Sequence, residues 1–193
     1  MKKIFFDVET ANQFSDVGST EATALDMSVV CIIESDGTKE SGQCFAKDDL
    51  AGLWKILEKA DMLIGFNSEH FDIPLLNKYY DGDLAKIRGL DLLKEIRKVL
   101  GFRVKLDSVA EATLGRKKIG HGLEAVMWWQ NGEKEKVMKY CLEDVRITKE
   151  IYEYTVKNNS LKYMDKGKAV KFDIDASGWE KETGSAITHT LPF

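Results

Sequence analysis

The chain has 193 residues, of which 44% are apolar and 31% are charged; this length and balance favour one folded domain and exclude a disordered chain. Its formal net charge is −4 and its isoelectric point is about 5.5, which excludes a protein that relies on a uniformly basic surface to bind phosphates. Any contact with nucleic acid must therefore be local.

The cysteines bear on metal binding and on the compartment. Cys31, Cys44 and Cys141 are odd in number, lack CxxC spacing and do not combine with the three histidines at zinc-ligand spacing, so we expect no zinc site. We expect free thiols, which suit a reducing compartment. No signal peptide precedes the first apolar run and no run approaches membrane-spanning length. The expectation is a cytoplasmic protein without membrane association.

The first third of the chain has the pattern of strands. Residues 3–8 form a short apolar run, and residues 27–34 form a β-branched run. Asp36-Gly37 then predicts a hairpin turn to a partner strand near residues 40–45. These segments predict a sheet with at least one antiparallel pair.

Helices alternate with strands from there on. Residues 48–59 have helical apolar spacing and residues 62–66 return to a strand pattern, so we expect a mixed α/β sheet. Residues 108–111 match a capping box, which predicts that a helix starts there. Residues 133–157 form the longest predicted helix, with an apolar stripe at Val137, Tyr140, Cys141, Val145, Thr148, Ile151, Tyr152 and Thr155.

The last residues differ in character from the rest. Residues 162–165 and the alternating residues 169–175 flank a Lys-Gly-Lys turn, which predicts a β-hairpin appended to the C-terminal side of the long helix.

Two acidic residues end the first strand. Side chains two apart share a face of a strand, so Asp7 and Glu9 lie side by side. Like charges so placed disfavour their ionised forms unless a cation lies between them. The alternative is that both residues form the solvated end of an edge strand.

A further carboxylate lies on the long helix. Tyr140 and Asp144 are four residues apart and therefore neighbours on one face, and Asp144 falls within the apolar stripe. A carboxylate on a buried face is costly unless it is paired or bound to metal. The alternative is a core aspartate satisfied by an arginine or by a helix terminus.

The last acidic candidate lies where a strand gives way to a helix, in residues 65–76. Asp72 precedes Ile73 and Pro74, and proline is well placed in a first helical turn. The alternative for Asp72 is therefore an N-cap.

Together the three segments resemble the three motifs of the DEDD exonuclease superfamily. They read Asp-x-Glu-Thr from Asp7, Asn-x-x-x-Phe-Asp from Asn67 and Tyr-x-x-x-Asp from Tyr140, in family order. The tyrosine form indicates the DEDDy branch. Residues 106–110 and 114–118 also resemble the region before the third motif in exonuclease domains of family-B DNA polymerases. The resemblance covers roughly residues 3–157.

The resemblance implies a fold, an activity and a cofactor. The fold is ribonuclease H-like, a mixed β-sheet flanked by α-helices, with residues 1–157 as the exonuclease domain. The hairpin predicted from the local pattern lies outside the shared motifs, and we expect residues 158–193 to form an appendage packed on the same domain. The activity is two-metal-dependent 3′–5′ exonucleolytic hydrolysis of phosphodiester bonds. Carboxylates supply the oxygen ligands that Mg²⁺ or Mn²⁺ prefer, and two such ions are expected in each active site.

The resemblance also implies roles for five residues. Asp7 bridges both metals, Glu9 and Asp144 complete the first site, and Asp72 holds the second metal through water. Tyr140 orients the nucleophilic water rather than acting as a strong base.

Substrate contacts follow in the same way. Thr10 lies near the 3′-terminal nucleotide, while Asn67 and Phe71 contact the last nucleotides, Phe71 by stacking. The dense basic cluster at residues 116–118, including Lys118 as a substrate-binding residue, grips phosphates. The alternative for this cluster is a solvated loop.

Other functions remain open. A non-cleaving domain that binds nucleic acid or a protein partner usually lacks one or more carboxylates, whereas all four and the tyrosine are present here. Transposases and integrases of the same broad fold lack the second and third motifs. We expect single-stranded 3′ ends as substrate, with DNA favoured over RNA because of the polymerase-like middle region, and an exoribonuclease as the alternative. The chain is either a free-standing trimming enzyme or a subunit whose substrate a protein partner supplies.

Overall fold

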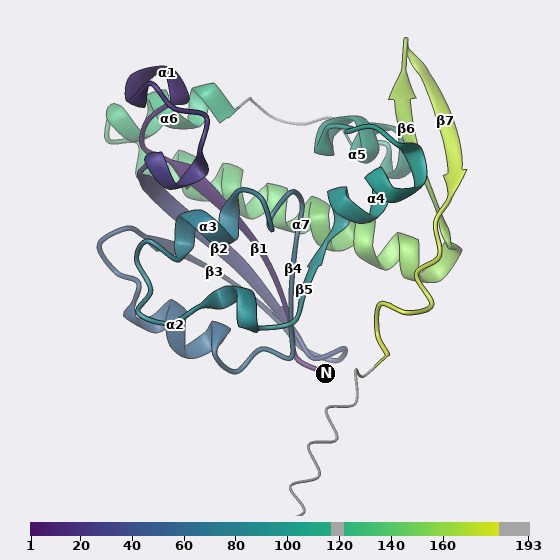
Figure 1. The fold of residues 1–193 in the computed structure, drawn as a ribbon, viewed down its shortest axis with the longest axis horizontal. Coiled ribbons are helices and arrows are strands. Elements are labelled where there is room, and N and C mark those ends of the chain that lie inside the picture. The colour runs from purple at the N-terminus through teal and green to yellow at the C-terminus, as the bar shows by residue number, and fades with distance from the viewer. Residues whose placement is uncertain (117–121, 182–193) are drawn as a thin grey trace, which may run out of the picture.

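A five-stranded mixed sheet forms the centre of the molecule (Figure 1). The computed structural model describes residues 1–116 and 122–181. The strand order is β3 (Glu40–Ala46), β2 (Met27–Ser35), β1 (Lys3–Thr10), β4 (Met62–Gly65) and β5 (Gly89–Asp91). β1 pairs antiparallel with β2 and parallel with β4, so it is a central strand. The sheet confirms the mixed α/β fold expected from the sequence.

The turn between β2 and β3 is the one that Asp36-Gly37 predicts. The Asp36 carboxylate accepts hydrogen bonds from the backbone N–H groups of Thr38 and Lys39, each at 2.8 Å. The bond from Lys39, the bond from the Thr38 hydroxyl at 2.8 Å and the bond from the Thr38 N–H together lower the pKa of Asp36 to about 2. Gly37 has φ +92°, a conformation that favours glycine. The hairpin is therefore confirmed in both strands and turn.

Helices cover both faces of the sheet. The described helical segments are α1 (Phe14–Val17), η1 (Ala22–Ala24), α2 (Ala51–Leu57), α3 (Asp72–Leu76), η2 (Leu84–Lys86), α4 (Leu92–Leu100), α5 (Leu106–Leu114), α6 (Gly122–Gln130) and α7 (Lys134–Asn158).

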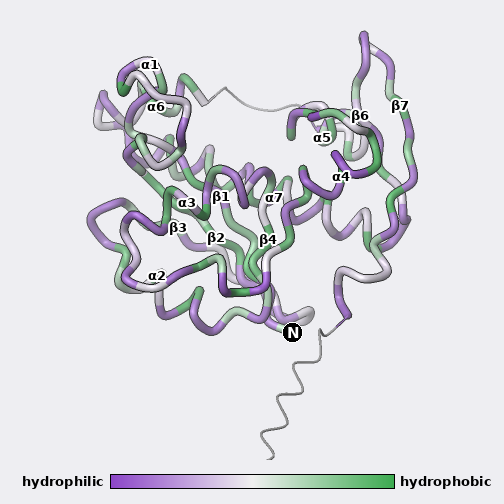
Figure 2. The backbone as a smooth tube through the Cα atoms, in the orientation of Figure 1, coloured by the Kyte–Doolittle hydropathy of each residue, from purple (hydrophilic) through white to green (hydrophobic). Residues whose placement is uncertain are grey.

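Two hydrophobic cores result, one on each face of the sheet. Alternation along β1 places Phe5 in the core beneath α7 and Phe6 in the core beneath α2 and α3. Figure 2 shows the strands in mainly hydrophobic colours inside a more hydrophilic periphery. The whole apolar stripe predicted for α7 is buried, which confirms that interpretation.

One local prediction is wrong, and one strand has no counterpart among the predicted elements. α5 begins at Leu106, so Ser108 is inside the helix and does not cap its start. Its hydroxyl instead donates to the carbonyl oxygen of Met164 at 3.1 Å and accepts from the Met164 N–H at 2.9 Å. Strand β5 was also not predicted, because three residues are too few to show a periodicity.

The expectation of three free thiols is wrong for two of them. Cys31 and Cys44 lie directly opposite each other in the β2–β3 register, with their Cα atoms 4.1 Å apart, and they form a disulfide. Cys141 is free and buried. The register of the sheet determines this pair, and the thiol argument for a reducing compartment no longer holds.

The predicted C-terminal hairpin is present. β6 (Ser160–Asp165) pairs antiparallel with β7 (Lys168–Asp173) and lies beside α5 and the end of α7. Within the described residues, no helix is both long enough and apolar enough to cross a membrane.

Candidate functional site

Three of the four predicted carboxylates come together where α7 crosses β1. Asp7, Glu9 and Asp144 each offer one carboxylate oxygen, and these oxygens all lie within 4.8 Å of one another. Glu9 is 9% exposed and Asp144 is 6% exposed. At Asp7 and Glu9 β1 pairs with β2, while its pairing with β4 ends at Phe5. Glu9 is nonetheless buried, so it is not a solvated strand end, and Asp144 lies in the middle of α7, so a helix terminus does not explain it.

The donor chemistry of this cluster suits a divalent cation. Carboxylates held so close, and largely removed from water, disfavour each other's ionised form. A hard cation bound by oxygen ligands relieves that repulsion, and the residues present provide such ligands. The three side chains therefore fit a divalent metal site.

Asp72, at the start of α3, also contacts β1. Its Oδ1 accepts a hydrogen bond of 3.0 Å from the backbone N–H of Val8, between Asp7 and Glu9 in the chain. Burial raises the pKa of Asp72 to about 7; nearby Asp91 adds to the rise, while the hydrogen bond from Val8 opposes it. α3 begins at Asp72 and its cap position is Phe71, so the N-cap interpretation does not hold. Asp72 is outside the group of three whose oxygens lie within 4.8 Å.

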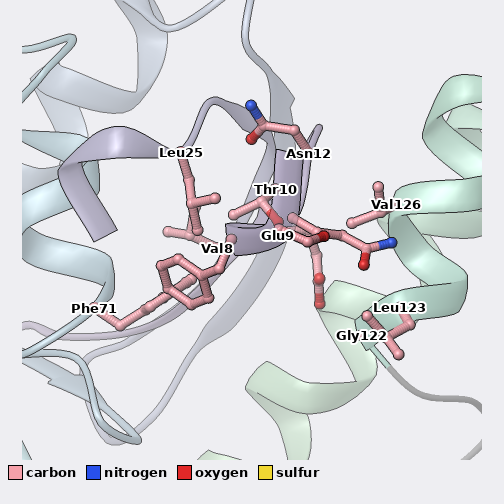
Figure 3. A pocket seen from close by; sticks show the side chains of 12 residues that line it. Val8, Glu9, Thr10, Asn12, Leu25, Phe71, Gly122, Leu123 and Val126 are labelled. Atoms are coloured by element: carbon pink, nitrogen blue, oxygen red, sulfur yellow. The ribbon is translucent and has the colours of Figure 1, made fainter. Parts of the chain in front are cut away.

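A pocket of about 470 Å³ opens beside the carboxylates (Figure 3). Glu9, Thr10 and Phe71 line it together with Phe14 and Leu123. The rings of Phe71 and Phe14 meet edge to face, with centroids 6.3 Å apart. The pocket combines aromatic and aliphatic walls with one carboxylate.

The loop between β4 and α3 is held by a residue that sequence analysis missed. The carboxylate of Asp91 accepts hydrogen bonds from the backbone N–H groups of Asn67 at 2.8 Å and Glu69 at 3.1 Å. It also caps α4, accepting from Leu93 and Lys94. Its place directly before an amphipathic helical pattern is a signal that could have found it.

Asn67 itself is constrained within this loop. It has φ +68°, an uncommon conformation that asparagine tolerates better than most residues. Its side-chain oxygen accepts a hydrogen bond of 2.6 Å from Nη2 of Arg103. Asn67 does not line the pocket beside Glu9.

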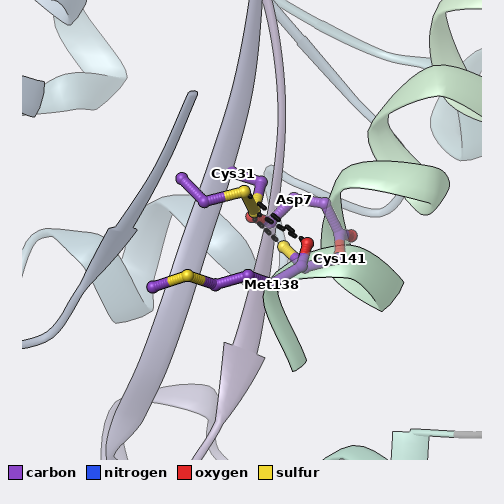
Figure 4. The surroundings of a disulfide bond; sticks show 5 residues. Asp7, Cys31, Met138 and Cys141 are labelled. Atoms are coloured by element: carbon purple, nitrogen blue, oxygen red, sulfur yellow. Dashed lines mark hydrogen bonds between the residues drawn. A yellow bond between two sulfur atoms is a disulfide. The ribbon is translucent and has the colours of Figure 1, made fainter. Parts of the chain in front are cut away.

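Cys141 joins α7 to β1 (Figure 4). Its thiol donates a hydrogen bond of 3.2 Å to the carbonyl oxygen of Asp7. Burial raises the pKa of Cys141 well above its usual value, and the negative charges of Asp7, Glu9 and Asp144 raise it further. The thiol therefore stays protonated and serves as a donor. The Cys31–Cys44 disulfide lies close by, with Sγ of Cys31 3.4 Å from the carbonyl oxygen of Met138.

Tyr140 occupies the position that the third motif predicts. It is 6% exposed and lies on the buried face of α7, four residues before Asp144. Its ring meets that of Trp128 edge to face, with centroids 5.9 Å apart. This contact with α6 restricts the orientation of the phenol ring.

The predicted basic cluster lies only partly within the described residues. Lys117 and Lys118 fall outside them. Arg116 forms ion pairs with Glu143 at 2.9 Å and Glu150 at 2.7 Å, both on α7. Its charge is therefore balanced within the protein.

Two comparisons with known proteins agree with this geometry. A family model described as the RNase_H superfamily matches residues 4–156. The chain is also similar to a DNA polymerase of Thermococcus aggregans, with 32% identity over 111 residues. That match covers 53% of this chain and 6% of the polymerase, so the chain corresponds to a small part of that relative.

Proposed function

The chain belongs to the RNase H superfamily, and on this premise we propose that it is a metal-dependent 3′–5′ exonuclease acting on single-stranded nucleic acid. The observation that carries the proposal is the group of half-buried Asp7 with buried Glu9 and Asp144, whose oxygens lie within 4.8 Å of one another. Asp72, bound to the backbone of the same strand, completes the set of four carboxylates.

The cofactor we propose is a pair of divalent cations, Mg²⁺ or Mn²⁺. Asp7, Glu9 and Asp144 would hold them, with Asp72 as the fourth carboxylate. Bound there, such ions activate water and stabilise the negative charge that develops on the phosphate.

The protein's own groups position the reactants. Tyr140 would orient the attacking water with a hydroxyl whose ring is held against Trp128. Phe71 would stack on the 3′-terminal base in the pocket, and the Thr10 backbone would contact the same nucleotide. We retain Asn67 and Lys118 as proposed contacts to neighbouring nucleotides. Stacking of the 3′-terminal base in the pocket would hold the last phosphate near the carboxylates.

DNA is proposed as the preferred substrate, since the relative is named a DNA polymerase. As an alternative to a free-standing enzyme, we also propose a protein partner that supplies the substrate. Residues 1–157 would form the nuclease domain and residues 158–193 its appendage.

The test is cleavage by Asp144→Asn, with Glu135→Gln as control. Glu135 is an exposed acid on the same helix. Losing a metal ligand should reduce kcat/KM about a thousandfold or more, equivalent to roughly 4 kcal/mol of transition-state stabilisation. The control should keep wild-type activity. Full activity in a folded Asp144→Asn protein would refute the proposal.

Linear and circular substrates test whether cleavage starts at a 3′ end, and DNA and RNA substrates test the sugar preference. A 5′-labelled linear strand should yield a ladder that shortens from its 3′ end in the presence of Mg²⁺ or Mn²⁺ and none with EDTA. A circular single strand should stay intact, and its cleavage would indicate an endonuclease. Parallel RNA and duplex substrates distinguish DNA preference from an exoribonuclease.

A further inference from the structure

The β6–β7 hairpin concentrates positive charge outside the matched family region. It follows residues 4–156 and carries four lysines and two aspartates. Lys162 and Lys171 share one face, Lys168 lies opposite Asp165 on the other face, and Lys166 lies at the turn. None of these lysines forms an ion pair within residues 1–116 and 122–181. Toward its tip the hairpin is coloured mainly hydrophilic (Figure 2). In a chain of net charge −4, this is a local cationic surface.

Two of these lysines lie where they repel each other. Lys162 is directly opposite Lys171 in the hairpin register, so both side chains project from the same face. Like charges in this position destabilise a strand pair. An anion bound between them would remove that repulsion.

α5 holds the hairpin in place. Ser108 exchanges two hydrogen bonds with the backbone of Met164, and Thr113 exchanges two with the backbone of Lys162, both at 2.9 Å. These hydroxyls bond to the backbone N–H and C=O groups on the edge of β6 with which a neighbouring strand would otherwise pair. The lysines are therefore presented on an ordered support, which lowers the entropic cost of binding.

A short segment after α4 connects the hairpin to the candidate site. Phe102 meets the ring of Tyr163 on β6 edge to face at 5.7 Å. The next residue, Arg103, donates to Asn67 in the loop before Asp72. Lys105 is exposed in the same segment. α4, α5 and the hairpin lie together on one side of the molecule, opposite α1 and α6 (Figure 1).

We propose that Arg103, Lys105 and the four hairpin lysines form a track that binds the phosphates of the nucleic-acid strand upstream of its 3′ end. The proposal rests on the proposed function for the location of that end. From Asp144 to the end of α7 at Asn158 the helix rises about 21 Å. At about 3.4 Å per stacked nucleotide, the hairpin is roughly six nucleotides from the carboxylates. A trinucleotide would not reach it.

The test compares long and short substrates in a variant with all four hairpin lysines changed to glutamine. The control is Lys55→Gln/Lys59→Gln, an exposed pair with Lys55 on α2 and Lys59 in the turn after it, on the other face of the sheet. Binding of a fluorescent single-stranded 20-mer is measured in EDTA over a range of salt concentrations. Cleavage of the 20-mer and of a trinucleotide is measured with Mg²⁺.

We expect at least a tenfold loss of 20-mer affinity in the hairpin variant and no loss in the control. The slope of log affinity against log salt should fall by about 0.7 for each lost phosphate contact. Its kcat/KM for the 20-mer should fall at least tenfold relative to that for the trinucleotide. Changing the four lysines to arginine should restore binding.

Two results would overturn the proposal. An unchanged 20-mer affinity and salt slope would mean that the surface serves something other than nucleic acid, such as an acidic protein. An equal loss on the trinucleotide would mean that the hairpin only supports the fold of the site. Failure of the wild-type protein to cleave either substrate would count against the proposed function, while 20-mer binding would still test the track.

Discussion

Tyr140 lies one turn before Asp144 on the buried face of α7, with its ring against Trp128. Tyr140→Phe keeps the ring and removes the hydroxyl. If that hydroxyl orients water, kcat should fall about tenfold to a hundredfold while KM and metal affinity stay close to those of the wild type. The fall should be smaller than for Asp144→Asn. Steady-state rates and calorimetric metal titration measure this, and loss of metal binding in Tyr140→Phe would make the tyrosine a structural support.

At the scale of elements, Asp91 ties the β4–α3 loop to α4 through four backbone N–H groups. Asp91→Ala leaves these buried or half-buried donors without their acceptor, so we expect about 2–4 kcal/mol lower stability. Hydrogen exchange at the amides of Asn67 and Glu69 should become faster. The control is Asp83→Ala, which removes an exposed cap from η2. Unchanged exchange at both amides would show that the loop does not depend on Asp91.

The Cys31–Cys44 disulfide joins β2 and β3 across 13 residues of sequence. Alkylation of the denatured, unreduced protein should modify one thiol, that of Cys141, and alkylation after reduction should modify three. Because the cross-link restricts the unfolded chain, reduction should lower stability by about 3 kcal/mol. Mass spectrometry and urea denaturation measure the two effects. Three reactive thiols before reduction would contradict the disulfide and restore the expectation of free cysteines.

At the scale of the whole molecule, the buried acids connect stability to pH. The pKa of Asp72 is raised from 3.8 to about 7, so between these values the folded state binds a proton that the unfolded state has lost. This group's contribution to stability therefore falls as pH rises from about 4 to about 7, and the resulting penalty stays constant above that.

Asp72→Asn removes this titration and keeps an oxygen for the N–H of Val8. Without metal, the stability of the variant minus that of the wild type should increase from pH 5 to pH 8, by an amount on the order of a few kcal/mol at most. Urea denaturation in EDTA at the two pH values measures the difference. A stability difference that does not change with pH would contradict the raised pKa.

The sequence by itself determined the parts that depend on local periodicity. A period of two along β1 is enough to place Asp7 and Glu9 on one face. A period of 3.6 along α7 is enough to place Tyr140 and Asp144 on its buried side. Motif order then indicated that these faces meet, and the oxygens of Asp7, Glu9 and Asp144 do lie together.

Only the tertiary structure decided which distant residues meet. The cysteine pair depends on the register of β2 against β3, and the role of Asp91 depends on the neighbouring ends of β4 and β5. Arg116 forms ion pairs with Glu143 and Glu150 of α7, and no local pattern indicates this contact. Ser108, which the sequence suggested as a helix cap, bonds to β6 because α5 begins two residues earlier and packs along that strand. Contacts of this kind depend on the packing of separate elements, and no periodicity within one element encodes them.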